Sequence, residues 1–219
     1  RQMCIRDRYN VGALKLCNAI AGAYAEKSPV LVISGSPGVK ERNEDFLLHH
    51  VVRSFENQQK MFKHITCYSV ILDDPTRAGF YIDEAFEALQ KYKQPVYIEL
   101  PRDVAEMSLR YDVYRQGTPV SKPTDPATLL DASEEVVNWI KNAKKPVIMA
   151  GVQIARFGLG SQLVRFAERH NIPMVTTLLS KSTINEHHPL FAGVYSGYQS
   201  SQNSLRQLVD ESDCLLIFG

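Results

Sequence analysis

The hydrophobic residues of the first half of the chain alternate between two patterns. Short apolar segments with the length of buried strands occupy 30–34, 67–72 and 94–101. Segments with hydrophobic residues at helical spacing occupy 12–26, 55–65 and 73–92. Strands that are apolar on both faces and alternate with helices are typical of parallel sheets covered by helices. Residues 9–101 therefore predict one α/β domain.

The helix predicted over 73–92 has the clearest boundary signals. Asp74 or Thr76 is a plausible N-cap, because both side chains can accept hydrogen bonds from the first turn of a helix. The spacing of the apolar residues places one set on a single face: Ile82, Ala85, Phe86 and Leu89. We expect this face to pack on the sheet.

The pattern stops at residues 102–127 and then starts again. This segment loses its periodicity and gains proline, glycine, serine and threonine, which is typical of a linker. Beyond it, helical spacing returns over 127–143, 160–171 and 203–212. Strand-like segments occupy 145–151, 172–178 and 213–219. In the helix predicted over 127–143, four apolar side chains are expected to face the core: Leu130, Val136, Val137 and Ile140.

Residues 128–219 therefore predict a second α/β domain. The chain ends with a predicted strand, where such folds usually continue into a loop and a helix. The predicted fold class is α/β, with two parallel-sheet domains and both ends truncated.

The first eight residues, RQMCIRDR, have a different character. They resemble a translated sequencing-adapter read, and they show no helix cap, helical period or strand alternation. We therefore expect residues 1–8 to lie outside the fold. The remaining cysteines are Cys17, Cys67 and Cys214, without a CxxC spacing, which favours a reduced, cytoplasmic protein.

Composition and charge exclude two classes of partner. The chain is 44% hydrophobic and 22% charged, with a formal net charge of +1 and no cluster of lysine and arginine. This argues against binding to nucleic acid or to an anionic membrane surface. No apolar run approaches the roughly 20 residues that span a bilayer.

Three sequence features invite a functional interpretation that their context does not support. Gly35 and Gly151 follow apolar strands, but neither belongs to a G-x-G-x-x-G or GK[ST] motif, so tight turns are favoured over nucleotide binding. The pair His187–His188 has no HExxH pattern and no cysteine at metal-ligand spacing. We expect this pair to be structural, and we predict no metal ligands.

His49 and His50 form a second histidine pair with a more suggestive context. They follow a loop that leaves the carboxyl end of a predicted parallel strand, which is where open α/β sheets place their ligands. Imidazole donates and accepts protons near neutral pH, as general acid–base catalysis requires. Neighbouring side chains of an extended segment point apart, so only one is expected to face a substrate. The residues alone leave a catalytic pair and an ordinary loop pair equally open.

Several motifs in a fixed order resemble one known family. They are the helix start at Val11–Gly12, AGAYAE at 21–26, PVLVISG at 29–35, LLHH at 47–50, and PVYIELPRD at 95–103. KPVIMAG, IPMVTT, HPLFAGVYSG and ESDCLLIFG follow downstream. Together they are similar to the thiamine-diphosphate-dependent 2-oxo-acid decarboxylases of the pyruvate and indolepyruvate or phenylpyruvate type. Asn10 departs from the family pattern, which has glycine there.

The resemblance implies a role for each segment. Residues 9–101 would be the C-terminal part of a pyrimidine-binding domain, and 128–219 an incomplete central domain. His49 and His50 would line the active site, with His50 facing the substrate and His49 supporting it. Val11 and Gly12 would lie beside the aminopyrimidine ring of the cofactor.

The same resemblance places other functional groups outside this chain. The ligands of Mg²⁺ and of the cofactor diphosphate, and the glutamate that activates the pyrimidine, would lie upstream or downstream. The chain alone is therefore expected to be inactive. The complete enzyme would act on a small 2-oxo acid as a homo-oligomer, either a dimer or a tetramer.

Two alternatives remain open. One is an acetolactate-synthase-like carboligase of the same cofactor class, although such relatives usually lack the double histidine. The other is a noncatalytic dinucleotide-binding module, against which the missing G-x-G-x-x-G motif weighs.

Overall fold

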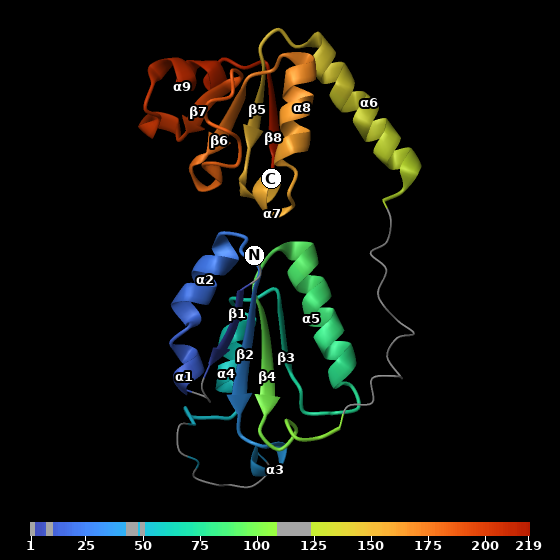
Figure 1. Cartoon of the computed structure of the whole chain (residues 1–219), viewed down its shortest axis with the longest axis vertical. Helices are drawn as coiled ribbons and strands as arrows, with labels where there is room; N and C mark the ends of the chain where they lie inside the picture. The colour runs from blue at the N-terminus through green and yellow to red at the C-terminus, as the bar shows by residue number, and fades with distance from the viewer. Residues whose placement is uncertain (1–2, 8–10, 43–47, 49–50, 109–123) are drawn as a thin grey trace. The chain divides into compact units, whose positions relative to one another are not determined.

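The computed structural model of the chain describes residues 3–7, 11–42, 48, 51–108 and 124–219, with the side chains of 3–7 excepted. It divides into two compact units, Arg1–Pro119 and Val120–Gly219 (Figure 1). Each unit contains a parallel four-stranded sheet with helices packed on it. The predicted α/β fold class with two parallel-sheet domains is confirmed. The division between the units falls inside the segment 102–127.

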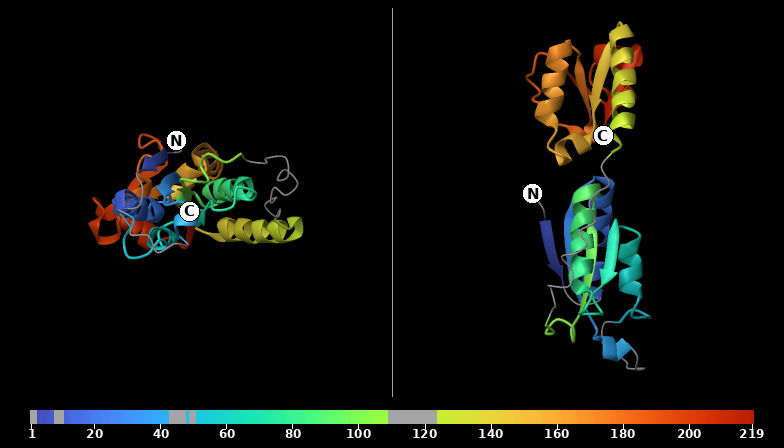
Figure 2. Two further views of the ribbon diagram at one scale, coloured as in Figure 1. Left: turned by 90° about the horizontal axis from the view of Figure 1, so that it is seen from below. Right: turned by 90° about the vertical axis from the view of Figure 1, so that its right-hand side faces the viewer.

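The sheet of the first unit has the order β1-β2-β4-β3, and every neighbouring pair is parallel. Its strands are β1 (Met3–Asp7), β2 (Val30–Ser36), β3 (Tyr68–Ile71) and β4 (Val96–Pro101). Figure 2 shows β1 at one edge of this sheet in its right-hand view. Because all four strands run in the same direction, their carboxyl ends lie at one edge of the sheet.

Helices cover both faces of this sheet. These helices are α1 (Val11–Leu14), α2 (Cys17–Ala25), α4 (Asn57–Lys63) and α5 (Ala78–Tyr92), whereas the short α3 (Val39–Arg42) lies beyond the carboxyl ends of the strands (Figure 1). On one face Ala13, Ile20 and Phe62 from α1, α2 and α4 pack against Tyr97. On the other face Ala85 and Leu89 of α5 pack against Val96 and Ile98. The alternation of side chains along β4 therefore builds two cores, one on each side of the sheet.

The second unit repeats this architecture with a sheet of order β7-β6-β5-β8. Its strands are β5 (Pro146–Ala150), β6 (Met174–Thr177), β7 (Phe191–Tyr195) and β8 (Cys214–Phe218). Its helices are α6 (Pro126–Asn142), α7 (Val152–Arg156), α8 (Gly160–His170) and α9 (Asn203–Asp210). Two short 3-10 helices, η2 (Leu178–Ser180) and η3 (Gly197–Gln199), follow β6 and β7. One core lies under α7 and α8, and the other under α9.

Three expectations for the first unit were wrong. Residues 3–7 form a strand, β1, that pairs with β2, because a parallel ladder is made by backbone groups and needs no alternation of side chains. Helix α5 begins only after Arg77, and Asp74 accepts a hydrogen bond from the Thr76 N–H at 2.8 Å instead of capping the helix. Phe86 is 41% exposed, because it lies at the margin of the buried face formed by Ala85 and Leu89.

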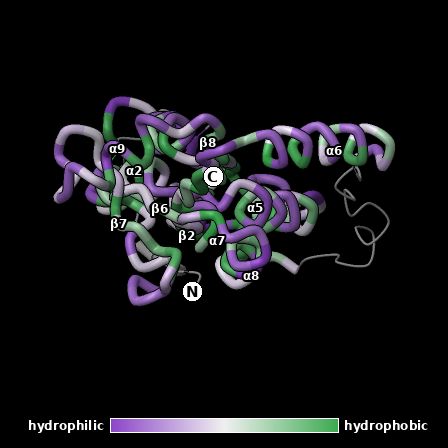
Figure 3. The backbone as a smooth tube through the Cα atoms, turned by 90° about the horizontal axis from the view of Figure 1, so that it is seen from above, coloured by the Kyte–Doolittle hydropathy of each residue, from purple (hydrophilic) through white to green (hydrophobic). Residues whose placement is uncertain are grey.

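The predicted inward face of the first helix in the second unit, α6, was largely wrong. The helix exists, with Asp125 accepting a hydrogen bond from the Thr128 N–H at its start, but none of its residues is buried. Leu130, Val136 and Val137 are exposed, and only Ile140 packs against the core. Figure 3 shows hydrophobic and hydrophilic segments alternating along α6, so the helix is amphipathic although most of its apolar side chains are exposed.

Besides the two 3-10 helices, one strand and one α-helix of the second unit were not predicted. Strand β7 was missed because Gly193, with a φ of 138°, interrupts its apolar pattern, and its pairing with β6 is irregular between Met174 and Val175. Helix α7 was missed because its five residues are too few to establish a helical period.

The two separate cores predict where a protease cuts first. Trypsin should cleave initially after Arg110 or Arg115, because these sites lie between the last strand of the first unit and α6 of the second. Mass spectrometry of the earliest fragments would identify the bond. An initial cut inside 128–219 would contradict the two-domain interpretation.

Candidate active site

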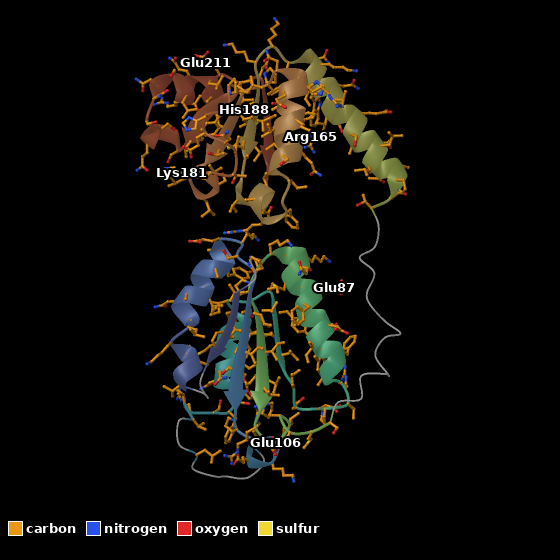
Figure 4. The ribbon with its side chains drawn as sticks, in the orientation of Figure 1. Glu87, Glu106, Arg165, Lys181, His188 and Glu211 are labelled. Atoms are coloured by element: carbon orange, nitrogen blue, oxygen red, sulfur yellow. The ribbon has the colours of Figure 1, made fainter. Side chains whose placement is uncertain are left out.

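Of the site residues predicted from the sequence, the structure describes Val11 and Gly12, which lie near the carboxyl edge of the first sheet. Helix α1 follows β1 at this edge, and α3 follows β2 (Figure 1). Val11 and Gly12 open α1, and the Val11 side chain is 41% exposed. His49 and His50 lie outside the described residues, between α3 and α4 in the sequence. Figure 4 labels Glu106 beside α3, in the turns that follow β4.

A buried carboxylate lies at the end of the central strand β4. Glu99 has no exposed surface, and its Oε1 lies 2.7 Å from Nη2 of Arg42. Its Oε2 accepts a hydrogen bond of 2.9 Å from the hydroxyl of Tyr97. That hydroxyl in turn accepts a hydrogen bond from Nε2 of Gln58, which also lies 3.0 Å from Oγ of Ser34. We call these five residues, Ser34, Arg42, Gln58, Tyr97 and Glu99, the polar network.

Each member of the polar network is placed by a different element. Ser34 comes from β2, Arg42 from the end of α3, Gln58 from the first turn of α4, and Tyr97 and Glu99 from one face of β4. The ring of Tyr97 stacks on Phe62 with a centroid distance of 4.3 Å, which fixes the direction of its hydroxyl. The network therefore joins both helices that flank the histidine pair to the sheet.

Burial dominates the electrostatics of this network. It raises the pKa of Glu99, and Arg42 together with the hydroxyls of Tyr97 and Ser36 opposes only part of that effect. Burial also raises the pKa of Tyr97 far above its usual value, with the charge of Glu99 as the second cause. Tyr97 therefore stays protonated near neutral pH and acts as the hydrogen-bond donor to Glu99.

Two polar atoms of the network have no hydrogen-bond partner among the described residues. They are Oε1 of Gln58 and Nε of Arg42, and both are buried. Buried polar atoms in native proteins are almost always paired with protein or with water.

This network was not predicted from the sequence. A signal was present, because Glu99 interrupts a strand whose neighbours are apolar on both faces, and a charged residue is rarely buried without a partner. The partners could not be named, since Arg42 and Gln58 come from helices whose approach to β4 is set by packing.

The pair His187–His188 has structural contacts. Nδ1 of His188, which Figure 4 labels, accepts a hydrogen bond of 3.2 Å from the Leu190 N–H, and its Nε2 lies 3.1 Å from Oε1 of Glu168 on α8. One ring nitrogen therefore holds a turn within the loop, and the other joins the loop to a helix. His187 is exposed, and its backbone N–H donates to Oδ1 of Asn185 at 3.1 Å.

The two glycines also have structural explanations. Gly35 lies inside β2, where it pairs with Leu100. At Gly151 a Cβ atom would lie 2.5 Å from the carbonyl oxygen of Gly219, so glycine permits the close approach of these two backbones.

The second unit has a groove without catalytic groups. It has a volume of about 500 Å³ and lies between α6 and the body of the unit. Its lining is mainly apolar and includes Val136, Val137, Ile140, Ile154, Phe166 and Phe218. Across the described ranges, no three histidine, cysteine, aspartate or glutamate side chains come close enough to hold a metal ion. No helix in those ranges is long and apolar enough to cross a membrane.

Comparisons with known proteins connect both units to one family. Residues 133–219 match the family described as the thiamine pyrophosphate enzyme, central domain. The chain is 36% identical to an indole-3-pyruvate decarboxylase of Azospirillum brasilense, over 96% of this chain and 38% of that protein.

Two yeast proteins are also similar to nearly the whole chain. A probable pyruvate decarboxylase of Schizosaccharomyces pombe is 35% identical over 96% of the chain and 37% of its own length. A pyruvate decarboxylase of Candida albicans is 31% identical over 96% of the chain and 38% of its own length. The chain thus spans less than two fifths of the relatives it matches. These similarities support the family that the motifs indicated, the thiamine-diphosphate-dependent 2-oxo-acid decarboxylases.

Proposed function

We propose that this chain is part of an enzyme that converts a 2-oxo acid to an aldehyde and carbon dioxide with thiamine diphosphate. The observation that carries the proposal is the similarity of nearly the whole chain to indolepyruvate and pyruvate decarboxylases. In the sequence His49–His50 follow β2 and α3, and open α/β sheets bind their ligands beyond the carboxyl ends of the strands, which agrees with the proposal. The substrate is a 2-oxo acid of the pyruvate, indolepyruvate or phenylpyruvate type.

The histidine pair supplies two functions that the reaction needs. The substrate carboxylate must be recognised before it leaves, and a proton must then reach the carbon from which carbon dioxide has departed. His50 serves the substrate directly, by a hydrogen bond to the carboxylate or by proton transfer. His49 supports it by orienting the neighbouring group or relaying the proton.

The described residues fit one side of the cofactor. Val11 presents a partly exposed apolar side chain at the start of α1, where a flat aminopyrimidine ring could pack, and Gly12 beside it adds no bulk. When bound, thiamine diphosphate supplies the electron sink for the departing carbon dioxide. Mg²⁺ and the diphosphate would be held by residues of the longer protein outside this chain.

The proposal also assigns the domains of the chain and the oligomeric state and compartment of the longer protein. Residues 9–101 form the C-terminal part of the pyrimidine-binding domain, 102–127 the linker, and 128–219 the central domain. The longer protein is a homodimer or homotetramer in the cytoplasm. Three free cysteines, Cys17, Cys67 and Cys214, fit a reducing compartment.

Because some of the residues that would bind the cofactor lie outside this chain, we predict that the chain alone binds thiamine diphosphate weakly. Titration with thiamine diphosphate and Mg²⁺ should give little or no heat in calorimetry, because the ligands of the diphosphate and the metal are missing. The chain should also release no carbon dioxide from pyruvate, phenylpyruvate or indolepyruvate. Tight, magnesium-dependent binding of thiamine diphosphate to the isolated chain would contradict the assignment of the diphosphate and Mg²⁺ ligands to residues outside it.

Substitution of the histidines in the full-length protein tests their roles. His50→Ala should lower kcat by roughly 10²–10⁴-fold, the range for a lost general acid–base group. His49→Ala should lower it less, because its role is support. Steady-state kinetics with a 2-oxo acid, coupled to detection of the aldehyde, measures both effects.

The other histidine pair provides matched controls. His187→Ala should leave turnover nearly unchanged, because the side chain is exposed, and His188→Ala should act only through stability. Circular dichroism and thermal unfolding must show that each variant is folded. Equal losses of activity in folded His50→Ala and His188→Ala variants would refute the contrast between the pairs.

A further inference from the structure

Among the residues of helix α1, only Ala13 is buried. The helix is a single turn, Val11–Leu14, and a single turn is unstable unless tertiary contacts fix it. Ala13 has no exposed surface, whereas Val11 is 41% exposed. The Leu16 N–H donates to the carbonyl of Ala13 at 3.0 Å and closes the turn. The position of Val11 and Gly12 therefore depends on the side chains against which Ala13 packs.

Phe62 on α4 lies in the same core as Ala13. Both side chains have no exposed surface and share one cluster with Tyr97, and α1 and α4 contact each other. The rings of Phe62 and Tyr97 are stacked, with centroids 4.3 Å apart and planes inclined by 3°. Protein cores are close-packed, so a change in the size of one side chain either moves its neighbours or leaves a void. The stacked pair therefore limits where α1 can lie.

The stacked pair is itself fixed to the sheet. Gln58 and Phe62 lie one helical turn apart on α4, and both are buried. Gln58 donates from Nε2 to the Tyr97 hydroxyl, and that hydroxyl donates to Oε2 of Glu99 at 2.9 Å. At the other end of α4, the Thr66 hydroxyl donates to the carbonyl of Phe62 at 2.7 Å. Helix α4 thus holds Tyr97 by its ring and by its hydroxyl, and Tyr97 belongs to the interior strand β4.

We propose that Phe62 is a positioning residue for the cofactor. Its stack with Tyr97 supports Ala13, and through Ala13 it sets the place of Val11 and Gly12 beside the aminopyrimidine ring. The inference rests on the proposed function, because that function brings the ring to the start of α1. Phe62 has no exposed surface, so it acts through α1 and not by touching the cofactor. A shift of about 1 Å in a positioning element can cost roughly 10²-fold in activity, so a small displacement of α1 is enough to be measured.

The first test uses this chain and does not depend on enzymatic activity. Phe62→Leu removes the flat ring but keeps an apolar side chain. The Leu16 amide should exchange with deuterium at least roughly tenfold faster in this variant, because its hydrogen bond closes the turn that Phe62 supports. Exchange resolved by NMR measures this rate. The amides of β2 and β4 in the same sample report opening of the whole unit.

Leu89→Ala is the matched control. It removes the same number of side-chain carbons from the core under α5, where Leu89 is also buried. It should destabilise the unit but should not raise the Leu16 rate relative to the amides of β2 and β4. Equal relative rates in Phe62→Leu and Leu89→Ala would overturn the proposal. Should Phe62→Leu not fold, Phe62→Met replaces it with the same expectation, because methionine adapts to irregular gaps.

The second test uses the full-length protein and titration with thiamine diphosphate at saturating Mg²⁺. Phe62→Leu should raise the Kd of the cofactor roughly tenfold through the displaced start of α1. The KM for the 2-oxo acid, measured at saturating cofactor, should be nearly unchanged, because Phe62 acts on the cofactor side of the site. Leu89→Ala should leave the Kd of the cofactor nearly unchanged in folded protein.

A double-mutant cycle shows whether the effect runs through α1. In a Val11→Ala background, Phe62→Leu should raise the Kd of thiamine diphosphate by less than about threefold, because residues that act through one another are not additive. A general structural role would give the same increase in both backgrounds, and that result would overturn the proposal.

These measurements separate the two proposals. If the full-length wild type binds thiamine diphosphate but decarboxylates no 2-oxo acid, the proposed function fails, while the Kd of Phe62→Leu still decides the positioning role. If the wild type is active and Phe62→Leu binds the cofactor equally tightly, the positioning role fails and the proposed function stands.

Discussion

The burial of a carboxylate at the end of β4 is the constraint on which the first unit depends. Glu99 has no exposed surface, and a charge in such an environment requires partners that remain in place. Arg42 and Tyr97 provide them, and Gln58 extends the arrangement to α4. Truncating one partner of a buried pair typically costs about 3–5 kcal/mol, so the positions of α3 and α4 are linked to that of β4.

This constraint gives the PVYIELPRD motif a physical meaning. Its tyrosine and glutamate belong to the polar network, and its aspartate caps α3. The apolar residues of the same motif, Val96 and Ile98, pack on the opposite face under α5. One strand therefore supplies the core on one face of the sheet and the polar contacts of the candidate site on the other.

Much of the fold could be predicted, because parallel sheets leave a strong pattern in the sequence. Apolar runs such as 30–34 must be buried on both faces, and they appear as β2 and its neighbours. Strand β7 could not be predicted, since Gly193 breaks its pattern and only its pairing with β6 identifies it. The exposure of Leu130 and Val137 on α6 depends on tertiary packing, which a helical period does not contain.

The candidate site was predictable only in part. The topology of a parallel sheet indicates the carboxyl edge, and the motifs indicate His49 and His50. The polar network joins residues that are far apart in sequence, since Arg42 and Glu99 differ by 57 in residue number and Gln58 and Tyr97 by 39. Such contacts depend on how the helices cross the sheet, and no local sequence pattern predicts them.

We propose that the chain belongs to an enzyme that decarboxylates one 2-oxo acid to an aldehyde and does not join two of them. The most direct measurement is the stoichiometry of products formed from one 2-oxo acid by the full-length protein with thiamine diphosphate and Mg²⁺. The account predicts one carbon dioxide and one aldehyde for each 2-oxo acid consumed. One carbon dioxide for every two 2-oxo acids, with a joined carbon skeleton as product, would contradict it and identify a carboligase.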